Sequence, residues 1–211
     1  MRSKKEWLHK ANLYLILDAQ VSSYSQLLEI LKKSVRSGVD IVQLRDKTGS
    51  AREILEFTLR AMKIVGDKVP FIINDRLDLA VLSNAPGVHV GQEDIPVGEA
   101  RKLLGSRKII GVSCQTLDHA RSAQRGGADY IGFGSVFKTQ TKPGRSPMDL
   151  KVLQAVTREI SIPVFAIGGI TCKNIGRLRE LGVERVAVCR DICCAPDVSK
   201  VVKDFKKLLV A

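Results

Sequence analysis

Eight short apolar runs alternate with amphipathic segments along the chain of 211 residues. Each run is the length of a strand, and the segment after it carries apolar residues at helical spacing. Eight strand–helix units in about 210 residues predict a (β/α)8 TIM barrel, a single domain over residues 1–211 with a short N-terminal helical extension. An open, doubly wound sheet is the alternative. The runs are residues 13–17, 41–44, 71–73, 87–90, 108–113, 130–134, 164–169 and 185–188.

Polar residues and glycines follow one apolar run after another. Parallel strands bring their carboxyl ends to one rim, and in (β/α)8 barrels the chemistry takes place at that rim. We therefore expect these residues to converge in space. They are Gln43, Arg45, Lys47, Asn74, Asp75, Asp94, Ser113, Thr139, Lys142, Gly168, Gly169 and Arg190.

Two acids, Asp75 and Asp94, follow the consecutive runs at 71–73 and 87–90. Neighbouring strands lie about 4.8 Å apart, so these carboxylates would repel unless one takes a proton or a cation lies between them. Hard oxygen ligands suit Mg2+, which keeps several waters and shares phosphate-bearing substrates. The pair predicts a Mg2+–diphosphate site. The alternative is that both acids cap the helices that follow them.

Gln43 and Arg45 lie two residues apart in the second run, and strand alternation places them on the same face. Arg45 and Lys47 offer cations for a diphosphate, while Gln43 offers an amide donor and acceptor for a heterocycle. The alternative is a surface cluster in which Arg45, Asp46 and Lys47 pair with one another.

The glycine-rich segment Ile167–Ile170, with Thr171 and a helix near Asn174, is typical of a phosphate site after the seventh barrel strand. The alternative is a turn needed only for packing. The chain has no P-loop and no GxGxxG after its first strand, which removes support for nucleotide hydrolysis and dinucleotide binding.

The histidines offer no obvious base. His89 lies inside a predicted strand and is interpreted as a core residue with satisfied hydrogen bonds, and no Ser–His–acid set is evident. A reaction that needs a strong protein base or nucleophile is therefore disfavoured. One in which Mg2+ and cations stabilise a departing diphosphate is favoured.

The composition limits the partners. A net charge of +12 suits nucleic acid, a membrane surface or an anionic small substrate. Aromatic residues make up only 5%, few for base stacking, and no apolar run approaches the roughly 20 residues of a membrane span. Five cysteines without a CxxC pair favour a reducing compartment. We expect a cytoplasmic protein that takes small phosphate and diphosphate compounds, without nucleic acid or membrane, and leave a homo-oligomer open.

Seven motifs, in order, resemble the thiamine phosphate synthase family from about Leu13 to Ile192. They are QLRDK at 43–47, INDR at 73–76, GVHVGQED at 87–94, IGVS at 110–113, GADYIGFG at 127–134, TQTK at 139–142 and AIGGI at 166–170.

The resemblance implies a (β/α)8 barrel with Mg2+ as cofactor. It implies the joining of 4-amino-2-methyl-5-(diphosphooxymethyl)pyrimidine to a thiazole phosphate, with release of diphosphate through a pyrimidine methylene cation. By position, the pyrimidine diphosphate would be bound by Gln43, Leu44, Arg45, Asp46, Lys47, Asn74, Ser113 and Lys142. The thiazole phosphate would be bound by Thr139, Gln140, Thr141, Gly169, Cys189 and Arg190, and Mg2+ by Asp75 and Asp94. Arg45, Ser113 and Lys142 would be catalytic.

The chain departs from the family where the eighth strand ends. The family usually reads Val-Ser-Ala-Ile where this chain has Cys189-Arg190-Asp191-Ile192. Arg190 offers a bidentate phosphate contact or fills the thiazole pocket. The rival interpretations are a TenI-like thiazole tautomerase and a regulatory phosphate-binding or RNA-binding barrel. The two acids and Gln43 favour the synthase.

Overall fold

The strands close into a barrel in the computed structural model, which describes residues 4–140, 144 and 146–210. All eight pair in parallel and in chain order, and β8 pairs with β1. This closure confirms the predicted (β/α)8 barrel and excludes the open sheet. The strands are β1 (Leu13–Asp18), β2 (Ile41–Arg45), β3 (Phe71–Asn74), β4 (Gly87–Val90), β5 (Ile109–Cys114), β6 (Tyr130–Gly134), β7 (Val164–Ile167) and β8 (Val186–Val188).

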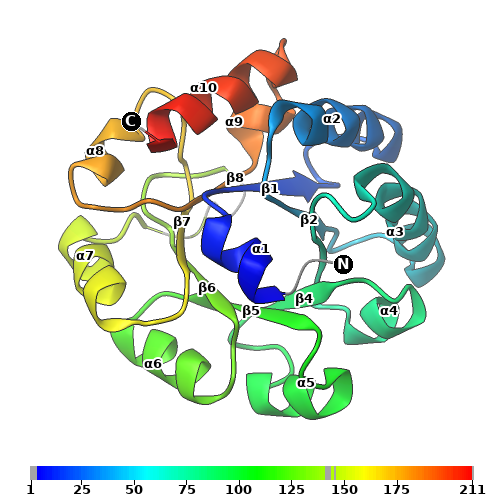
Figure 1. The fold of residues 1–211 in the computed structure, drawn as a ribbon, viewed down its shortest axis with the longest axis horizontal. Coiled ribbons are helices and arrows are strands. Elements are labelled where there is room, and N and C mark those ends of the chain that lie inside the picture. The colour runs from blue at the N-terminus through cyan, green and yellow to red at the C-terminus, as the bar shows by residue number, and fades with distance from the viewer. Residues whose placement is uncertain (1–3, 141–143, 145, 211) are drawn as a thin grey trace.

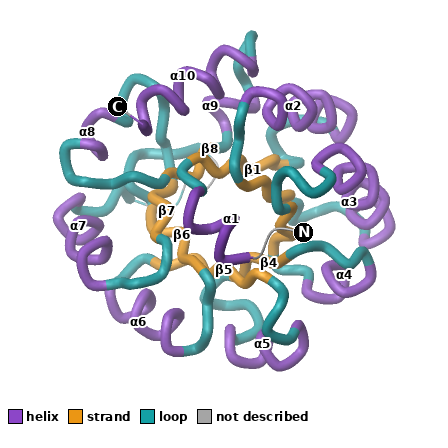
Figure 2. Tube along the Cα trace, viewed as in Figure 1, coloured by secondary structure: helices purple, strands orange, loops and turns teal. Residues whose placement is uncertain are grey.

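A ring of helices surrounds the strands (Figure 1). Figure 2 shows the two rings, with the strands inside and the helices outside. The described helices are α1 (Lys4–Lys10), α2 (Tyr24–Ser37), α3 (Ala51–Val65), α4 (Leu77–Leu82), α5 (Val97–Leu104), α6 (Leu117–Arg125), α7 (Leu150–Glu159), α8 (Gly176–Arg179), α9 (Arg190–Cys193) and α10 (Val198–Val210). None of these helices is long and apolar enough to traverse a bilayer.

Local sequence explains several helix ends. Ser23 and Ser50 precede α2 and α3 and form capping boxes. In each box the serine side chain accepts the backbone amide of the third helical residue, and the side chain of that residue accepts the backbone amide of the serine. Gly38 ends α2 in the left-handed conformation that glycine adopts without a Cβ penalty. These ends set the short loops that return the chain to the next strand.

The barrel has two apolar layers. Alternate strand residues point outward and pack against the helices, as Leu15 and Leu17 of β1 do. The residues between them point inward, and Tyr14, Tyr130 and Phe165 form edge-on aromatic contacts inside the barrel. This alternation follows from the two-residue period of a strand. It also decides which polar side chains reach the barrel interior.

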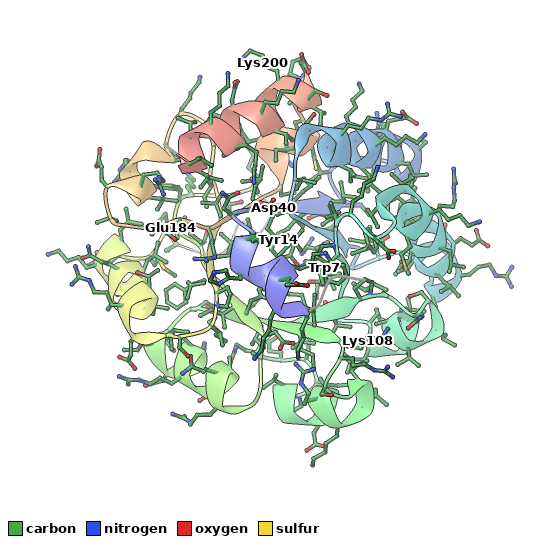
Figure 3. All side chains as sticks on the ribbon, in the orientation of Figure 1. Trp7, Tyr14, Asp40, Lys108, Glu184 and Lys200 are labelled. Atoms are coloured by element: carbon green, nitrogen blue, oxygen red, sulfur yellow. The ribbon has the colours of Figure 1, made fainter. Side chains whose placement is uncertain are left out.

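The helix α1 closes the amino-terminal end of the barrel. It crosses the middle of the ring in Figure 1, and Figure 3 labels Trp7 and Tyr14 near that centre. Leu8, which is 4% exposed, packs into the inner cluster with Trp7 beside it. An ion pair of 2.7 Å between Lys4 and Asp129 ties the helix to the segment before β6. The interior is therefore sealed at the end opposite the rim.

We expect Leu8→Ala to lower the free energy of unfolding by about 2–3 kcal/mol, because truncation leaves a cavity over the inner cluster. Urea denaturation followed by circular dichroism measures the change. Leu103→Ala on α5 is the matched control, since Leu103 is 61% exposed and its loss should cost less than about 0.5 kcal/mol. Equal stabilities for the two variants would contradict the sealing role of α1.

Two details differ from the helices expected from the sequence. A helix was expected near Asn174, but α8 begins only at Gly176 and ends at Arg179, because Asn174 bonds back to the turn before it. The short helix α9 begins directly after β8 and was not expected. Both differences occur beside the glycine-rich turn, where backbone groups serve the site.

Candidate active site

A cavity of about 330 Å3 opens at the carboxyl ends of the strands. Its size lies at the lower end of the range for small-molecule sites. The last residues of several strands line it, so most of the described residues predicted to converge at the rim do so, whereas Lys47, Asp75 and Asp94 are not part of the lining. Its floor is apolar and aromatic, and its upper wall is polar. The lining includes Tyr14, Ile16, Gln43, Arg45, Asn74, His89, Ser113, Phe165, Ile167, Gly168, Gly169, Cys189 and Arg190.

Asp75 and Asp94 form a hydrogen-bonded pair beside this cavity. Asn74 donates to Asp75 over 2.6 Å, and the Lys47 ammonium forms an ion pair with the same carboxylate. The Gly91 amide donates to Asp94 over 2.7 Å. Asp75 has a positive φ of 62°, which non-glycine residues seldom adopt. Its amide bonds the His89 carbonyl over 2.8 Å, and this contact holds the turn.

The two carboxyl groups shift each other's pKa in opposite directions. Burial raises the pKa of Asp75, and the negative charge of Asp94 adds to this, against the opposing effect of Lys47. Burial also acts to raise the pKa of Asp94, but the hydrogen bonds from Asp75 and the Gly91 amide and the charge of Lys47 lower it overall. This is the behaviour expected of two acids crowded at one site.

Neither acid serves as a helix cap. The capping positions of α4 and α5 are occupied by Arg76 and Pro96, and at neither helix does a side chain form a capping hydrogen bond. The alternative interpretation of the pair as two capping residues is therefore wrong. Asp75 and Asp94 instead lie close to each other past the carboxyl ends of β3 and β4.

Arg45 extends from the end of β2 into the cavity wall. Its guanidinium donates to Asp18 over 2.7 Å and to Gln20 over 3.0 Å. Asp18 is fully buried at the end of β1, and its other carboxylate oxygen accepts the Gln20 amide over 2.9 Å. This contact orients Arg45, and Asp18 is a site residue that the sequence analysis missed.

Two neighbours of Arg45 point elsewhere. Leu44 is 1% exposed and packs in the outer apolar layer, so its side chain does not face the cavity. The Asp46 carboxylate accepts the Tyr24 hydroxyl over 2.5 Å and the Gly49 amide over 2.7 Å. The suggested mutual pairing of Arg45, Asp46 and Lys47 is absent from this described segment, because each side chain binds a different partner.

The segment after β7 turns sharply beside the cavity. Gly168 and Gly169 have φ angles of 104° and 65°, and a Cβ on Gly169 would overlap the Lys138 carbonyl. Asn174 donates to the Gly169 carbonyl over 2.8 Å and accepts the Thr171 amide over 2.9 Å. No backbone hydrogen bond between described residues uses the Gly169 amide. This N–H is therefore available to an anion.

Other predicted residues lie around this turn. Thr139, Gln140, Cys189 and Arg190 all line the cavity, as does the exposed Lys138. Thr141 and Lys142, predicted for the thiazole phosphate and the pyrimidine diphosphate, lie outside the described residues. The turn and the acidic pair lie at the ends of different strands, β7 on one side and β3 and β4 on the other.

A largely buried chain of hydrogen bonds forms part of the cavity lining. It links Gln43 and Ser113 through the side chains of Tyr14, Tyr130 and His89. The interpretation of His89 as a satisfied core histidine agrees with this geometry. Tyr14 and Tyr130 were not predicted as part of the site, although strand alternation from Ile16 and Gly132 places both inside the barrel.

The fold and this site define a (β/α)8-barrel enzyme of the class that handles phosphate substrates at the strand ends. The model of the thiamine monophosphate synthase family matches residues 13–192. The chain belongs to this family and is an enzyme, a transferase.

Its relatives match it nearly from end to end. It is 39% identical to the thiamine-phosphate synthase of Ruminiclostridium cellulolyticum, over 100% of this chain and 99% of the relative. It is 42% identical to that of Shouchella clausii, over 88% and 90% of the two chains. The structure of thiamine phosphate pyrophosphorylase from Pyrococcus furiosus superposes with a TM-score of 0.86 at 31% identity, covering 95% and 96%. A 3-hexulose-6-phosphate synthase at 19% identity and a TM-score of 0.74 shares the fold.

Proposed function

We propose that this enzyme joins 4-amino-2-methyl-5-(diphosphooxymethyl)pyrimidine to a thiazole phosphate, either 4-methyl-5-(2-phosphoethyl)thiazole or its carboxy form. The products are thiamine phosphate and diphosphate, and the carboxy form also releases its carboxylate as CO2. One observation carries the proposal: Arg45 lines one side of a single cavity, where the acidic pair and Lys47 lie beside it, and a glycine-rich turn lines the other side. Two separate anion sites suit two phosphate-bearing substrates. We further propose that the enzyme acts in the cytoplasm.

Asp75 and Asp94 would hold Mg2+. The donor set fits this ion, since both ligands are hard carboxylates and Lys47 is the cation that pairs with Asp75. Across the described residues, no group of three or more acidic, histidine or cysteine side chains is arranged to hold a metal. Two carboxylates leave positions for water and diphosphate, as Mg2+ prefers. Bound there, Mg2+ would neutralise charge that develops on the leaving diphosphate.

Arg45 and Lys47 would stabilise the same leaving group. The bond between the methylene carbon and the diphosphate oxygen breaks, and the electron pair leaves with the diphosphate. The apolar floor, with Phe165 and Ile167, would keep water from the pyrimidine methylene cation. The pyrimidine amino group can help to delocalise this charge.

The second substrate would bind at the glycine-rich turn. Its phosphate would accept the Gly169 amide and pair with Arg190, while Thr139 and Gln140 lie nearby in the cavity wall. The thiazole nitrogen then donates its lone pair to the methylene carbon, forming a thiazolium. No proton has to be removed. This agrees with a cavity in which His89 is already bonded to Tyr130 and Ser113.

A direct assay tests the proposal. Purified protein is incubated with both substrates and Mg2+, and thiamine phosphate is detected by fluorescence after oxidation. We expect product that depends on both substrates and disappears when a chelator removes the metal. Absence of product with substrates that support a known synthase would refute the proposal. Product in the presence of excess chelator would refute the role of Mg2+ alone.

Arg190→Ser should raise the KM for the thiazole phosphate about 10-fold, because a charge-assisted phosphate contact contributes roughly 1.5–3 kcal/mol. The KM for the pyrimidine diphosphate should stay within about twofold, since Arg190 lies at the end of β8 beside the glycine-rich turn. Initial rates with each substrate varied in turn measure both constants. Arg185→Ser is the control, because Arg185 precedes β8 and contacts the His9 carbonyl at the sealed end. An unchanged KM in Arg190→Ser would place this side chain outside the phosphate site.

A further inference from the structure

Five inward-facing side chains form one continuous hydrogen-bonded chain across the barrel. Gln43 Nε2 donates to the Tyr14 hydroxyl over 2.6 Å, and that hydroxyl lies 2.7 Å from the Tyr130 hydroxyl. The Tyr130 oxygen lies 3.0 Å from His89 Nδ1, and His89 Nε2 lies 2.9 Å from Ser113 Oγ. Five different strands contribute, and all five residues except Tyr130 line the cavity, including both terminal ones.

The middle of the chain is closed to solvent. Tyr14 and Tyr130 are 1% and 0% exposed, and His89 is 6% exposed. Burial strongly raises the pKa of each tyrosine, so both hydroxyls keep their protons. A buried polar group that lacks a partner is costly. Each member of the chain is therefore held to the orientation that satisfies its neighbours.

Proton counting gives this chain a direction. Each hydroxyl has one hydrogen to donate. Because the Tyr14 oxygen accepts from Gln43, its own hydrogen is directed to Tyr130. If His89 is neutral, the Tyr130 hydrogen is then directed to His89 Nδ1, and His89 donates from Nε2 to Ser113. The carbonyl oxygen of Gln43 and the hydrogen of Ser113 remain for the cavity.

Only one other order satisfies every hydroxyl with a neutral His89. If the Gln43 amide rotates by half a turn, the donor and the acceptor exchange roles in every hydrogen bond of the chain. The groups that then face the cavity are an amide N–H of Gln43 and a lone pair of Ser113. Rotating one terminal residue alone would leave a buried donor facing a donor. The two ends are thus linked, although their strands, β2 and β5, are not neighbours.

We infer that Tyr14, Tyr130 and His89 are positioning residues that couple Gln43 to Ser113, so that the cavity offers an acceptor at one end and a hydroxyl donor at the other. The occupant that fits is a flat heterocycle with an amino donor on one edge and a ring-nitrogen acceptor on another. This inference rests on the proposed function, in which an aminopyrimidine occupies the cavity. The new element is that Tyr14, Tyr130 and His89 orient Gln43 and Ser113, the two groups that would bind the ring.

Tyr130→Phe tests the coupling, because it keeps the ring and removes the central hydroxyl. We expect the KM for the pyrimidine diphosphate to rise about 10-fold, as for loss of a buried hydrogen-bonded link. The KM for the thiazole phosphate should stay within about twofold. Thr58→Val is the control, since Thr58 is a fully buried hydroxyl on α3 without a described partner. An equal KM for the pyrimidine diphosphate in Tyr130→Phe and in the wild type would overturn the inference.

A double-mutant cycle separates coupling from general damage. Gln43→Leu and Ser113→Ala are made singly and together, in the wild type and in Tyr130→Phe. We expect non-additive effects on kcat/KM in the wild type and additive effects once Tyr130 loses its hydroxyl. Additive effects in the wild type would overturn the coupling. If the wild type makes no thiamine phosphate at all, the proposed function fails instead.

A spectroscopic measurement needs no turnover. The chain has three histidines, so 15N chemical shifts at fixed pH can be assigned by replacing His9 and His119. We expect His89 to be the Nε2–H tautomer in the wild type and to lose that preference in Tyr130→Phe. An Nδ1–H tautomer in the wild type would overturn the stated direction. An unchanged tautomer in the variant would overturn the role of Tyr130.

Discussion

Asp94→Asn is expected to lower kcat by on the order of 10³-fold, the loss typical when a charge-stabilising group at a reacting centre is removed. Asparagine keeps the size of the side chain, and its carbonyl oxygen can still accept the Gly91 amide. The fold should therefore survive. What changes is the charge, because one of the two carboxylates proposed for Mg2+ is lost. Turnover is followed by thiamine phosphate fluorescence over a range of Mg2+ concentrations.

The control for this variant is Asp78→Asn. Asp78 lies on α4, only three residues from Asp75, and its side chain is 56% exposed and paired with Arg76. Its neutralisation should leave kcat within about twofold, since exposed ion pairs contribute little. Circular dichroism and thermal unfolding establish that both variants are folded. Wild-type turnover by Asp94→Asn at saturating Mg2+ would refute the metal assignment.

Asp18→Asn should lower the free energy of unfolding by about 3 kcal/mol, because removing one partner of a buried ion pair leaves the other charge uncompensated. Asp18 is fully buried, and Arg45 is only 11% exposed. Freed from Asp18, the guanidinium also loses its orientation toward the cavity. We expect the KM for the pyrimidine diphosphate to rise about 10- to 100-fold, as when outer contacts of a ligand-binding group are lost.

Urea unfolding and initial rates measure the two effects on the same protein. Glu99→Gln removes an exposed pair with Lys102 and should cost less than about 0.5 kcal/mol. Added inorganic diphosphate should stabilise the wild type more than Asp18→Asn. A variant that matches the wild type in both stability and KM would show that Asp18 neither compensates nor orients Arg45.

Much of this molecule follows from local pattern. The eight apolar runs, their length and the helical spacing between them predict parallel strands, and the short connections leave room for only one helix between a strand and the next. The same periodicity places Asp75, Asp94 and Gly169 just past strand ends. Their shared rim could therefore be predicted before any contact was known.

Other features depend on residues far apart in the chain. The loop after β2 turns Asp46 toward Tyr24, and no pattern within residues 43–47 signals that. Asp18 and Arg45 meet because β1 and β2 pair in one particular register. A slip of one residue would reverse every side chain between the barrel interior and the helix layer.

The amino-acid sequence by itself determined the order of strands and helices, the end of the barrel that carries chemistry and the identity of most groups there. Only the tertiary structure decided which of those groups touch. Closing eight strands into a ring brings Gln43, Tyr14, Tyr130, His89 and Ser113 into one hydrogen-bonded chain. The two-residue period of a strand predicts which face each side chain takes. The contacts of this chain cross the barrel, so they depend on the register between strands and on closure of the ring.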